Sequence, residues 1–235
     1  MFELSARAQD YVERTKQFIQ NEIEPIETDF WHEVHELNQG GDWTKWQWPA
    51  QLEMLKAKAK AAGLWNMFLP CPELGQGLSV QEYAHIAELT GRSLLAPTVF
   101  NCNAPDSGNM EVLWRYGSEA QKQEWLTQLL DGKIRSVFCM TEPAVASSDA
   151  TNMQATAVIE GDEIVLNGRK WWSSGLGDPN AKIIIFMAHT PDETKDRHHQ
   201  HSMVLVPVET AGVKIERMLP VFGDYDAPHG HGEIS

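Results

Sequence analysis

The sequence has few cysteines, and the three present, Cys71, Cys102 and Cys139, show no paired spacing. An odd, scattered set argues against a disulfide framework and against a zinc ribbon, and it fits a reducing compartment. Basic residues are also scarce, because 19 lysines and arginines stand against 33 aspartates and glutamates, which gives a formal net charge of −14. A surface of this charge repels phosphate backbones and anionic lipids, so nucleic acids and membrane surfaces are poor candidate partners.

Long apolar segments are missing as well. The longest one, Ile183 to Ala188, has the length of a β-strand, whereas a membrane span takes roughly 20 residues. The segment from Met1 to Ser5 shows no basic stretch followed by an apolar run, and the N-terminus is too acidic for a typical mitochondrial presequence. The sequence therefore predicts a soluble, cytoplasmic protein.

Several common catalytic motifs are absent too. Gly175-Leu176-Gly177 is not followed by the third glycine of a dinucleotide-binding fingerprint, and there is no P-loop, Gly-x-Ser-x-Gly or His-Glu-x-x-His motif. A Rossmann dehydrogenase, an NTPase and a serine hydrolase therefore lose their usual support. The histidines at 32–35 and 198–201 lack a nearby cysteine or an ordered frame, and those at 229–231 are interpreted as structural. No metal site is predicted.

The first half of the chain has helix periodicity. Apolar residues recur every three or four positions over residues 4–23, and Pro25 is expected to end this helix. A second helix is predicted over 49–63, from a proline in the first turn to a glycine at the C-terminal end. Ser-x-x-Glu/Gln capping boxes open two further helices at 79–82 and 118–121. The tryptophan-rich link from Trp31 to Trp48 is interpreted as irregular.

Near residue 134 the apolar period changes from 3.6 to 2. A hairpin is predicted around Gly161-Asp162, and no helix-length segment separates the strands, which favours an antiparallel β domain. The strands are predicted at 134–140, 154–159, 163–166, 182–188, 202–208 and 213–218, with another starting at the chain's end. The fold class is therefore α+β, with an all-α domain over residues 1–134 and a β domain over residues 135–235.

Two polar segments of the β half suggest a ligand pocket. The strand from Phe138 runs into a proline-broken loop that is rich in small hydroxyl residues, and such a loop offers backbone N–H groups to a flat polar edge or a phosphate. The segment Lys170–Gly175 then places two tryptophans before two serines. Strand alternation predicts that Trp171 and Trp172 point to opposite faces, one into the core. By themselves, the two segments indicate a pocket for a flat polar ligand.

The same segments resemble the acyl-CoA dehydrogenase family. Met140-Thr141-Glu142-Pro143 with Ser148-Asp149 resembles the family's flavin loop, and Leu166 to Gly175 resembles its second flavin segment. Residues 204–215 are similar to the next hairpin, so the resemblance spans nearly the whole chain. The residues Thr141 to Asn152, with Pro228-His229-Gly230-His231, are similar to the branch of long-chain enzymes that are fused to kinase-like domains in animals.

The resemblance implies a fold, a cofactor and partners. It implies an all-α domain, an antiparallel β-barrel-like middle domain and a C-terminal four-helix bundle, the last absent from this chain. It also implies FAD as cofactor, an acyl-CoA substrate, electron-transferring flavoprotein as electron acceptor, and assembly of the complete protein as a dimer or tetramer. The cofactor-binding residues implied by the resemblance are Phe138, Met140, Thr141, Ser147, Ser148, Trp172, Ser173 and Ser174.

Individual roles follow from the same resemblance. Thr141 would donate to the flavin ring edge, and Trp172 would stack beside the ring. Ser174 would take the place of the hydroxyl residue, often threonine, near the reactive ring nitrogen. Ser148 would touch both the cofactor and the acyl-CoA, although the four residues before it replace a shorter glycine-rich stretch of many relatives.

The catalytic base is expected outside this sequence. Desaturation removes a proton from Cα and a hydride from Cβ, and the family uses a glutamate of the C-terminal bundle as base. No catalytic residue is therefore assigned within the 235 residues, and Glu142 is interpreted as part of the flavin-loop framework. Two alternatives remain open: a non-catalytic flavin or acyl-CoA binding chain of a split assembly, and an oxidase of the same fold.

Overall fold

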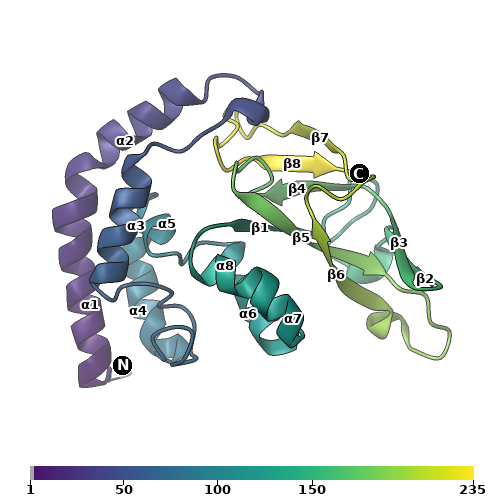
Figure 1. Cartoon of the computed structure of the whole chain (residues 1–235), viewed down its shortest axis with the longest axis horizontal. Coiled ribbons are helices and arrows are strands. Elements are labelled where there is room, and N and C mark those ends of the chain that lie inside the picture. The colour runs from purple at the N-terminus through teal and green to yellow at the C-terminus, as the bar shows by residue number, and fades with distance from the viewer. Residues whose placement is uncertain (1–2) are drawn as a thin grey trace. The chain divides into compact units, whose positions relative to one another are not determined.

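The computed structural model describes residues 3–235, so the prediction made from the segment Met1 to Ser5 falls partly outside the described residues. The chain divides into two compact units (Figure 1). The helical unit comprises Met1–Leu37 and Trp48–Lys133, and the β unit comprises Asn38–Gln47 and Ile134–Ser235. The segment Asn38–Gln47 thus packs with residues that lie a hundred positions later in the sequence. The α+β fold class is confirmed, and no helical bundle follows the β unit within residues 3–235.

The first helix does not end at Pro25, contrary to prediction. Helix α1 (Ala6–Phe18) passes through a π-helical turn, η1 (Ile19–Ile23), into α2 (Glu24–Leu37). The N–H of Glu24 bonds to the carbonyl of Ile19, five residues back, instead of four. A proline breaks a regular helix because its ring meets the carbonyl four residues earlier and because it lacks an N–H. The wider π turn directly before Pro25 changes this geometry, so the helix continues.

The other predicted helices are present. Helix α3 (Gln51–Ala61) ends before Gly63, whose positive φ of 67° matches the predicted C-terminal glycine. Both capping boxes form, at the starts of α4 (Val80–Thr90) and α7 (Glu119–Gln121), and α7 continues through η3 (Lys122–Leu126) into α8 (Thr127–Leu130). Helices α5 (Ala96–Val99) and α6 (Asp106–Tyr116) were not predicted from the sequence. The first is only four residues long, and the second contains Gly108 and Asn109, which are weak helix formers.

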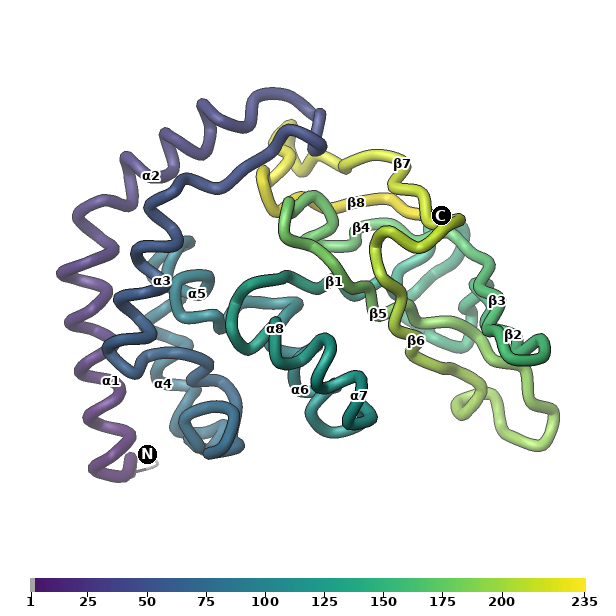
Figure 2. Tube along the Cα trace, viewed as in Figure 1, coloured from purple at the N-terminus to yellow at the C-terminus, as the bar shows by residue number. Residues whose placement is uncertain are grey.

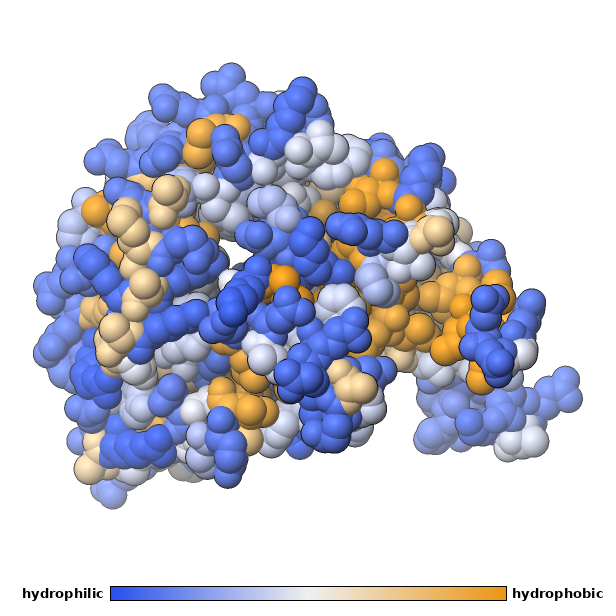
Figure 3. All heavy atoms as spheres, in the orientation of Figure 1, coloured by the Kyte–Doolittle hydropathy of each residue, from blue (hydrophilic) through white to orange (hydrophobic). Residues whose placement is uncertain are grey.

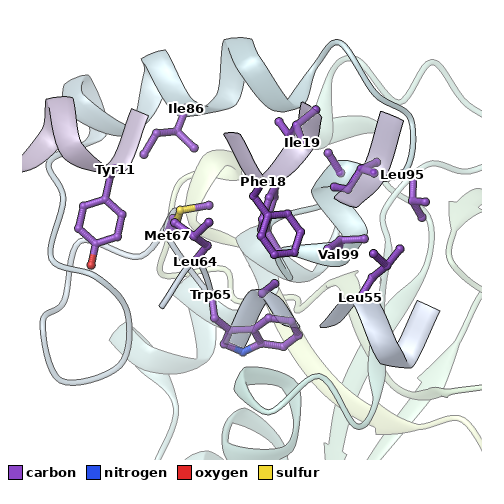
Figure 4. Packing of buried hydrophobic residues seen from close by; sticks show 14 of the residues in the cluster. Tyr11, Phe18, Ile19, Leu55, Leu64, Trp65, Met67, Ile86, Leu95 and Val99 are labelled. Carbon is purple, nitrogen blue, oxygen red and sulfur yellow. The ribbon is translucent and has the colours of Figure 1, made fainter. Parts of the chain in front are cut away.

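The predicted apolar stripe of the first helix forms the core of the helical unit. Figure 4 shows Phe18 in the middle of this cluster, which also contains Tyr11 and Ile19. The rings of Phe18 and Phe100 meet edge to face, with centroids 5.3 Å apart. Phe100 is fully buried. None of the helices within residues 3–235 is long and apolar enough to cross a membrane.

The β unit contains two sheets. The first has the order β1-β5-β2-β3, with β6 also paired to β5, and the second has the order β4-β8-β7. The strands of the first sheet are β1 (Arg135–Cys139), β2 (Thr156–Glu160), β3 (Glu163–Asn167), β5 (Ala181–His189) and β6 (His201–Pro207). Those of the second are β4 (Lys170–Ser174), β7 (Ile215–Met218) and β8 (His231–Ile234). The sheets do not close into a barrel.

Two strand pairs differ from the antiparallel prediction. Strand β1 pairs with β5 in parallel, as does β2 at Thr156 and His189. A parallel pair needs a crossover of a dozen or more residues, and helices usually supply it. Here the strands β2 to β4 make up the connection from β1 to β5, so the lack of a helix did not exclude parallel pairing.

Trp46 anchors the early segment to the β unit. Trp46 is 4% exposed, and it packs in a cluster with Leu176 and Met218. A Cβ added at Gly177 or Gly230 would lie 2.6 Å or 2.8 Å from the Trp46 ring, so both positions need glycine for the close approach. Figure 2 shows the segment turning beside the yellow C-terminal part of the chain.

Candidate functional site

The two segments predicted to bind flavin meet in the β unit. The N–H of Trp171 in β4 donates to the carbonyl of Thr141, at 3.0 Å. The ammonium group of Lys170 donates to the carbonyl of Met140, at 2.9 Å. These two bonds join the loop after β1 to the start of β4, thirty residues later in the chain.

A buried ion pair holds this junction. Lys170 Nζ lies 2.8 Å from Glu142 Oε1, and the two side chains are only 0% and 4% exposed. The carboxylate of Glu142 also accepts the N–H groups of Gln154 and Ala155, at 2.8 Å and 2.9 Å. A buried carboxylate needs such partners because removing the charge from water is costly. Glu142 therefore clamps both ends of the loop over residues 142–155.

The electrostatics of this pair follow from its burial and its contacts. Burial by itself raises the pKa of Glu142, but hydrogen bonds from Lys170 and from two backbone N–H groups outweigh burial and lower the pKa of this carboxyl. Burial also lowers the pKa of Lys170, and the Glu142 carboxylate offsets only part of that effect. A carboxylate so buried and so fully bonded is a framework group, in line with the interpretation of Glu142 from the sequence. Lys170 was not singled out from the sequence, although its position beside the two tryptophans of β4 marks the same segment.

Three of the predicted cofactor residues lie at the end of β1. Phe138 is half-buried in the strand, opposite Ile185 of β5, and Met140 is 39% exposed at the start of the loop. The half-buried hydroxyl of Thr141 makes no hydrogen bond with any group of residues 3–235. The backbone carbonyl of Thr141 already accepts the N–H of Trp171 in β4. The side-chain hydroxyl is therefore the group of Thr141 that could bind a ligand.

Ser147 and Ser148 have different surroundings. The hydroxyl oxygen of Ser147 accepts the N–H of Glu142 at 2.8 Å, so this side chain braces the loop. Ser148 is exposed, and its hydroxyl has no partner among the described residues. No hydrogen bond of the described residues joins Ser148 to β4. The structure thus brings the loop start and β4 together, while Ser148 stands on the outer part of the loop.

Strand alternation fails at the two tryptophans because β4 is bulged there. The pairing of β4 with β8 shifts register between Lys170 and Ser173. Trp172 lies in this bulge with a φ of 53°, a left-handed conformation that is strained for a bulky residue. Its ring is therefore a neighbour of the Trp171 ring, with centroids 6.1 Å apart, and the residue is 41% exposed. Packing of the core does not explain why Trp172 is exposed and has a strained backbone.

The two serines after the tryptophans face different ways. Ser173 is 1% exposed, and its hydroxyl lies beside the buried thiol of Cys139, so only its backbone is available to a ligand. Burial raises the pKa of that thiol to about 11. Ser174 is half-buried, and its hydroxyl lies 2.9 Å from Nδ1 of His231 in β8.

These groups fit a flat, polar, aromatic ligand such as flavin. The Trp172 ring offers an exposed aromatic surface, and Thr141 offers a hydroxyl with no partner within residues 3–235. Ser174 adds a hydroxyl whose outer side is not used by the protein's own contacts. Aromatic walls with a few placed polar groups are typical of cofactor sites.

A separate hollow of the β unit is apolar. Figure 3 shows the apolar side chains that gather over β5, β6 and β3. The hollow has a volume of about 210 Å³ and contains none of the predicted cofactor residues. Its lining includes Ile164, Leu166, Ile184, Phe186, Val206 and Ile234.

Family models cover both units of the chain. Residues 5–133 match the acyl-CoA dehydrogenase N-terminal domain, and residues 137–235 match the acyl-CoA dehydrogenase middle domain. The chain is 49% identical over its whole length to acyl-CoA dehydrogenase family member 11 of Gallus gallus. It is 48% identical, over 98% of its length, to family member 10 of Mus musculus. It spans only 30% and 21% of these two relatives, which leaves room in them for further domains.

Solved structures show the same fold. An acyl-CoA dehydrogenase candidate from Mycobacterium abscessus is 60% identical, with a TM-score of 0.93 over 100% of this chain and 58% of that chain. Butyryl-CoA dehydrogenase of Megasphaera elsdenii, at 21% identity and a TM-score of 0.69, matches 100% of this chain and 56% of that chain, and shares the fold. The resemblance read from the two flavin segments is thereby confirmed. The chain belongs to the acyl-CoA dehydrogenase family, and it comprises that family's N-terminal and middle domains.

Proposed function

We propose that the complete protein is an FAD-dependent acyl-CoA dehydrogenase that introduces an α,β double bond into an acyl-CoA thioester. The observation that carries this proposal is the junction of the loop after β1 with β4. Two hydrogen bonds join these segments, and the segments carry the Thr141 hydroxyl and the exposed Trp172 ring. The two segments come from distant parts of the sequence, and both resemble the flavin segments of the family. Membership of the family supports the same reading.

The chain's own residues would bind and orient the cofactor. FAD, when bound, supplies the acceptor for hydride, which no side chain can provide. The hydroxyl of Thr141 would donate a hydrogen bond to the edge of the flavin ring, and Trp172 would cover one side of the ring. The ion pair of Glu142 and Lys170 would keep both segments in place. Ser148, exposed on the same loop, would reach the cofactor and the acyl-CoA.

Partners are proposed on the same basis. We expect electron-transferring flavoprotein to reoxidise the flavin, and we expect the complete protein to assemble as a dimer or tetramer. The resemblance to the family implies that the base is a glutamate beyond residue 235. Glu142 is not proposed for this role, because it is buried and fully bonded.

An anaerobic titration of the complete, flavin-loaded protein with acyl-CoAs tests this function. The visible flavin spectrum is expected to bleach with one class of chain length, and that class identifies the substrate. A yellow protein that no acyl-CoA bleaches would favour the non-catalytic, split-assembly alternative. A bleached protein that air reoxidises rapidly, with release of peroxide, would be an oxidase. A protein unable to take up FAD would overturn the cofactor assignment.

A further inference from the structure

Three side chains of the β unit form a line that the role implied for Ser174 does not explain. Ser174 Oγ lies 2.9 Å from Nδ1 of His231, and Nε2 of the same ring lies 3.3 Å from Oδ2 of Asp226. The His231 side chain is 23% exposed and that of Asp226 is 59% exposed. The line therefore runs from the solvent-facing loop, through the histidine ring, to the Ser174 hydroxyl of β4.

The fold holds the side chains of Ser174, His231 and Asp226 close together. Ser174 and His231 face each other in the register of β4 and β8, and the N–H of Gly175 donates to the carbonyl of Gly230 at 2.9 Å. The loop before β8 returns through a bond from the N–H of Gly230 to the carbonyl of Asp226, at 2.8 Å. Since β-strand pairing and a closed turn fix the backbone on both sides, the ring of His231 has little freedom to leave Ser174.

The carboxylate determines which ring nitrogen carries the proton. An ionised aspartate only accepts hydrogen bonds, so it favours a proton on Nε2 of His231. In the neutral ring, Nδ1 is then an acceptor, and the Ser174 hydroxyl donates to it. The oxygen of Ser174 is left to accept a hydrogen bond from a ligand on its outer side.

Protonation of the ring reverses this polarity. A charged imidazole carries a proton on both nitrogens, so Nδ1 donates to the Ser174 oxygen. The hydroxyl hydrogen of Ser174 is then free to donate outward. The same serine thus presents an acceptor beside a neutral His231 and a donor beside a charged one.

We propose that His231, held by Asp226, is a positioning residue that sets whether Ser174 accepts or donates a hydrogen bond toward the bound flavin. This inference rests on the proposed function and on the resemblance to the family, which implies that Ser174 lies near the reactive ring nitrogen. That nitrogen accepts a hydrogen bond in oxidised flavin and carries a proton to donate in the reduced form. A serine whose polarity can change is suited to both forms, whereas a fixed donor or a fixed acceptor suits only one.

The surroundings of His231 contain few other titratable groups. The loop before β8 brings Asp226 and the ring of His229, whose centroid is 6.4 Å from that of His231. Strand β4 brings the uncharged Ser174 and the Trp172 ring, 6.3 Å from His231. On the other side, β7 and the residue after it bring Met218 and Leu219, which are apolar. Asp226 is therefore the carboxylate in contact with the His231 ring, and His229 is the other histidine beside it.

Nitrogen NMR tests the inference by two independent routes. The first follows the ring nitrogens of His231 in the FAD-free protein. We expect a neutral ring with the proton on Nε2, and we expect the Nδ1 signal to shift when Ser174→Ala removes its partner. The exposed Asp226→Asn variant is expected to increase the share of the opposite tautomer without loss of the fold. If the ring signals of His231 change in neither Ser174→Ala nor Asp226→Asn, the inference is overturned, whether or not flavin binds.

The second route follows the protein loaded with FAD that is labelled at the reactive nitrogen. When the pH is varied so that the ring of His231 changes charge, the label is expected to shift in a single step. His231→Asn keeps an acceptor near the Nδ1 position but cannot titrate, so the step should disappear. His35→Asn, a matched change at an exposed histidine of α2, should leave the step intact.

The outcomes separate the two proposals. A protein that takes up no FAD contradicts the proposed function, and the first route then still decides on the line of three residues. A protein that binds FAD but shows no pH step, or shows the same step in His231→Asn, keeps the function and overturns the inference.

Discussion

At the scale of single residues, the pair of Lys170 and Glu142 is the most informative. Its two groups are almost fully enclosed, yet each has charged or backbone partners within hydrogen-bond distance. A buried pair adds little net stability compared with apolar residues, but removal of one partner leaves a charge without compensation. The pair is therefore best understood as a lock between the loop and β4.

The substitution Lys170→Met tests this lock. It is expected to lower the free energy of unfolding by about 3–5 kcal/mol at pH 7, because the Glu142 carboxylate loses its cation. Lys182→Met, in the exposed pair with Glu209, is the matched control and should cost less than about 1 kcal/mol. Denaturant unfolding of both variants gives the comparison, and equal costs would argue against a lock.

The deficit of Lys170→Met should also depend on pH. In the folded protein the pKa of Glu142 is lowered, so its contribution is present above the unfolded value, near about 4.3, and is lost as the pH falls through the folded value. The difference between wild type and variant should therefore shrink in acid, where a protonated Glu142 needs no cation. A deficit that stays constant down to about pH 3 would mean that the carboxylate is not its cause.

At the scale of elements, the sequence predicts local signals better than pairings. The capping boxes at Ser79 and Ser118 and the turn at Gly161 form as predicted, since each depends on a few adjacent residues. The π turn before Pro25 and the parallel pairing of β1 with β5 were missed. Both depend on contacts between residues that are distant in sequence or on small changes of helix width, which composition and periodicity do not record.

The candidate site shows the same division. The two flavin segments can be found from the sequence, but their junction through Trp171 and Thr141 cannot, because it joins groups thirty positions apart. Alternation placed Trp171 and Trp172 on opposite faces, and the bulge in β4 makes their rings neighbours instead. A bulge changes the side-chain direction by one position, and nothing in a run of two tryptophans and two serines indicates it.

The bulged Trp172 is expected to matter for flavin and not for the fold. Trp172→Gly relieves a strained φ and should leave the FAD-free protein as stable as before, or up to about 1–2 kcal/mol more stable. FAD affinity should fall roughly tenfold, because stacked aromatic rings contribute about 0.5–1.5 kcal/mol beyond their buried area. Thermal unfolding without FAD and a fluorescence titration with FAD measure the two effects.

Phe222→Gly is the matched control for Trp172→Gly. Phe222 also has a positive φ, of 50°, and is fully exposed, but it is not among the predicted cofactor residues. The control should give a similar change of stability and an unchanged FAD affinity. If both variants lose FAD equally, or neither does, Trp172 has no stacking role.

At the scale of the whole molecule, the two units make up this chain but only part of the length of its relatives. The chain spans 30% of family member 11 of Gallus gallus and 58% of the Mycobacterium abscessus structure. The carboxylate of Glu142 in the flavin loop is buried and bonded to three donors. It cannot approach a substrate without breaking the contacts that hold the loop.

A polypeptide of these 235 residues is therefore expected to be inactive toward acyl-CoA. Proton removal from Cα needs a base within hydrogen-bond distance of the substrate, and Glu142 is held in the framework instead. The measurement compares anaerobic flavin bleaching by acyl-CoA in this polypeptide and in the complete protein, each loaded with FAD. Bleaching only in the complete protein is the expected result, and it agrees with a base outside residues 1–235. Bleaching in the shorter polypeptide that survives Glu142→Gln would mean that another of its own groups removes the proton, and bleaching abolished by that change would make Glu142 the base after all.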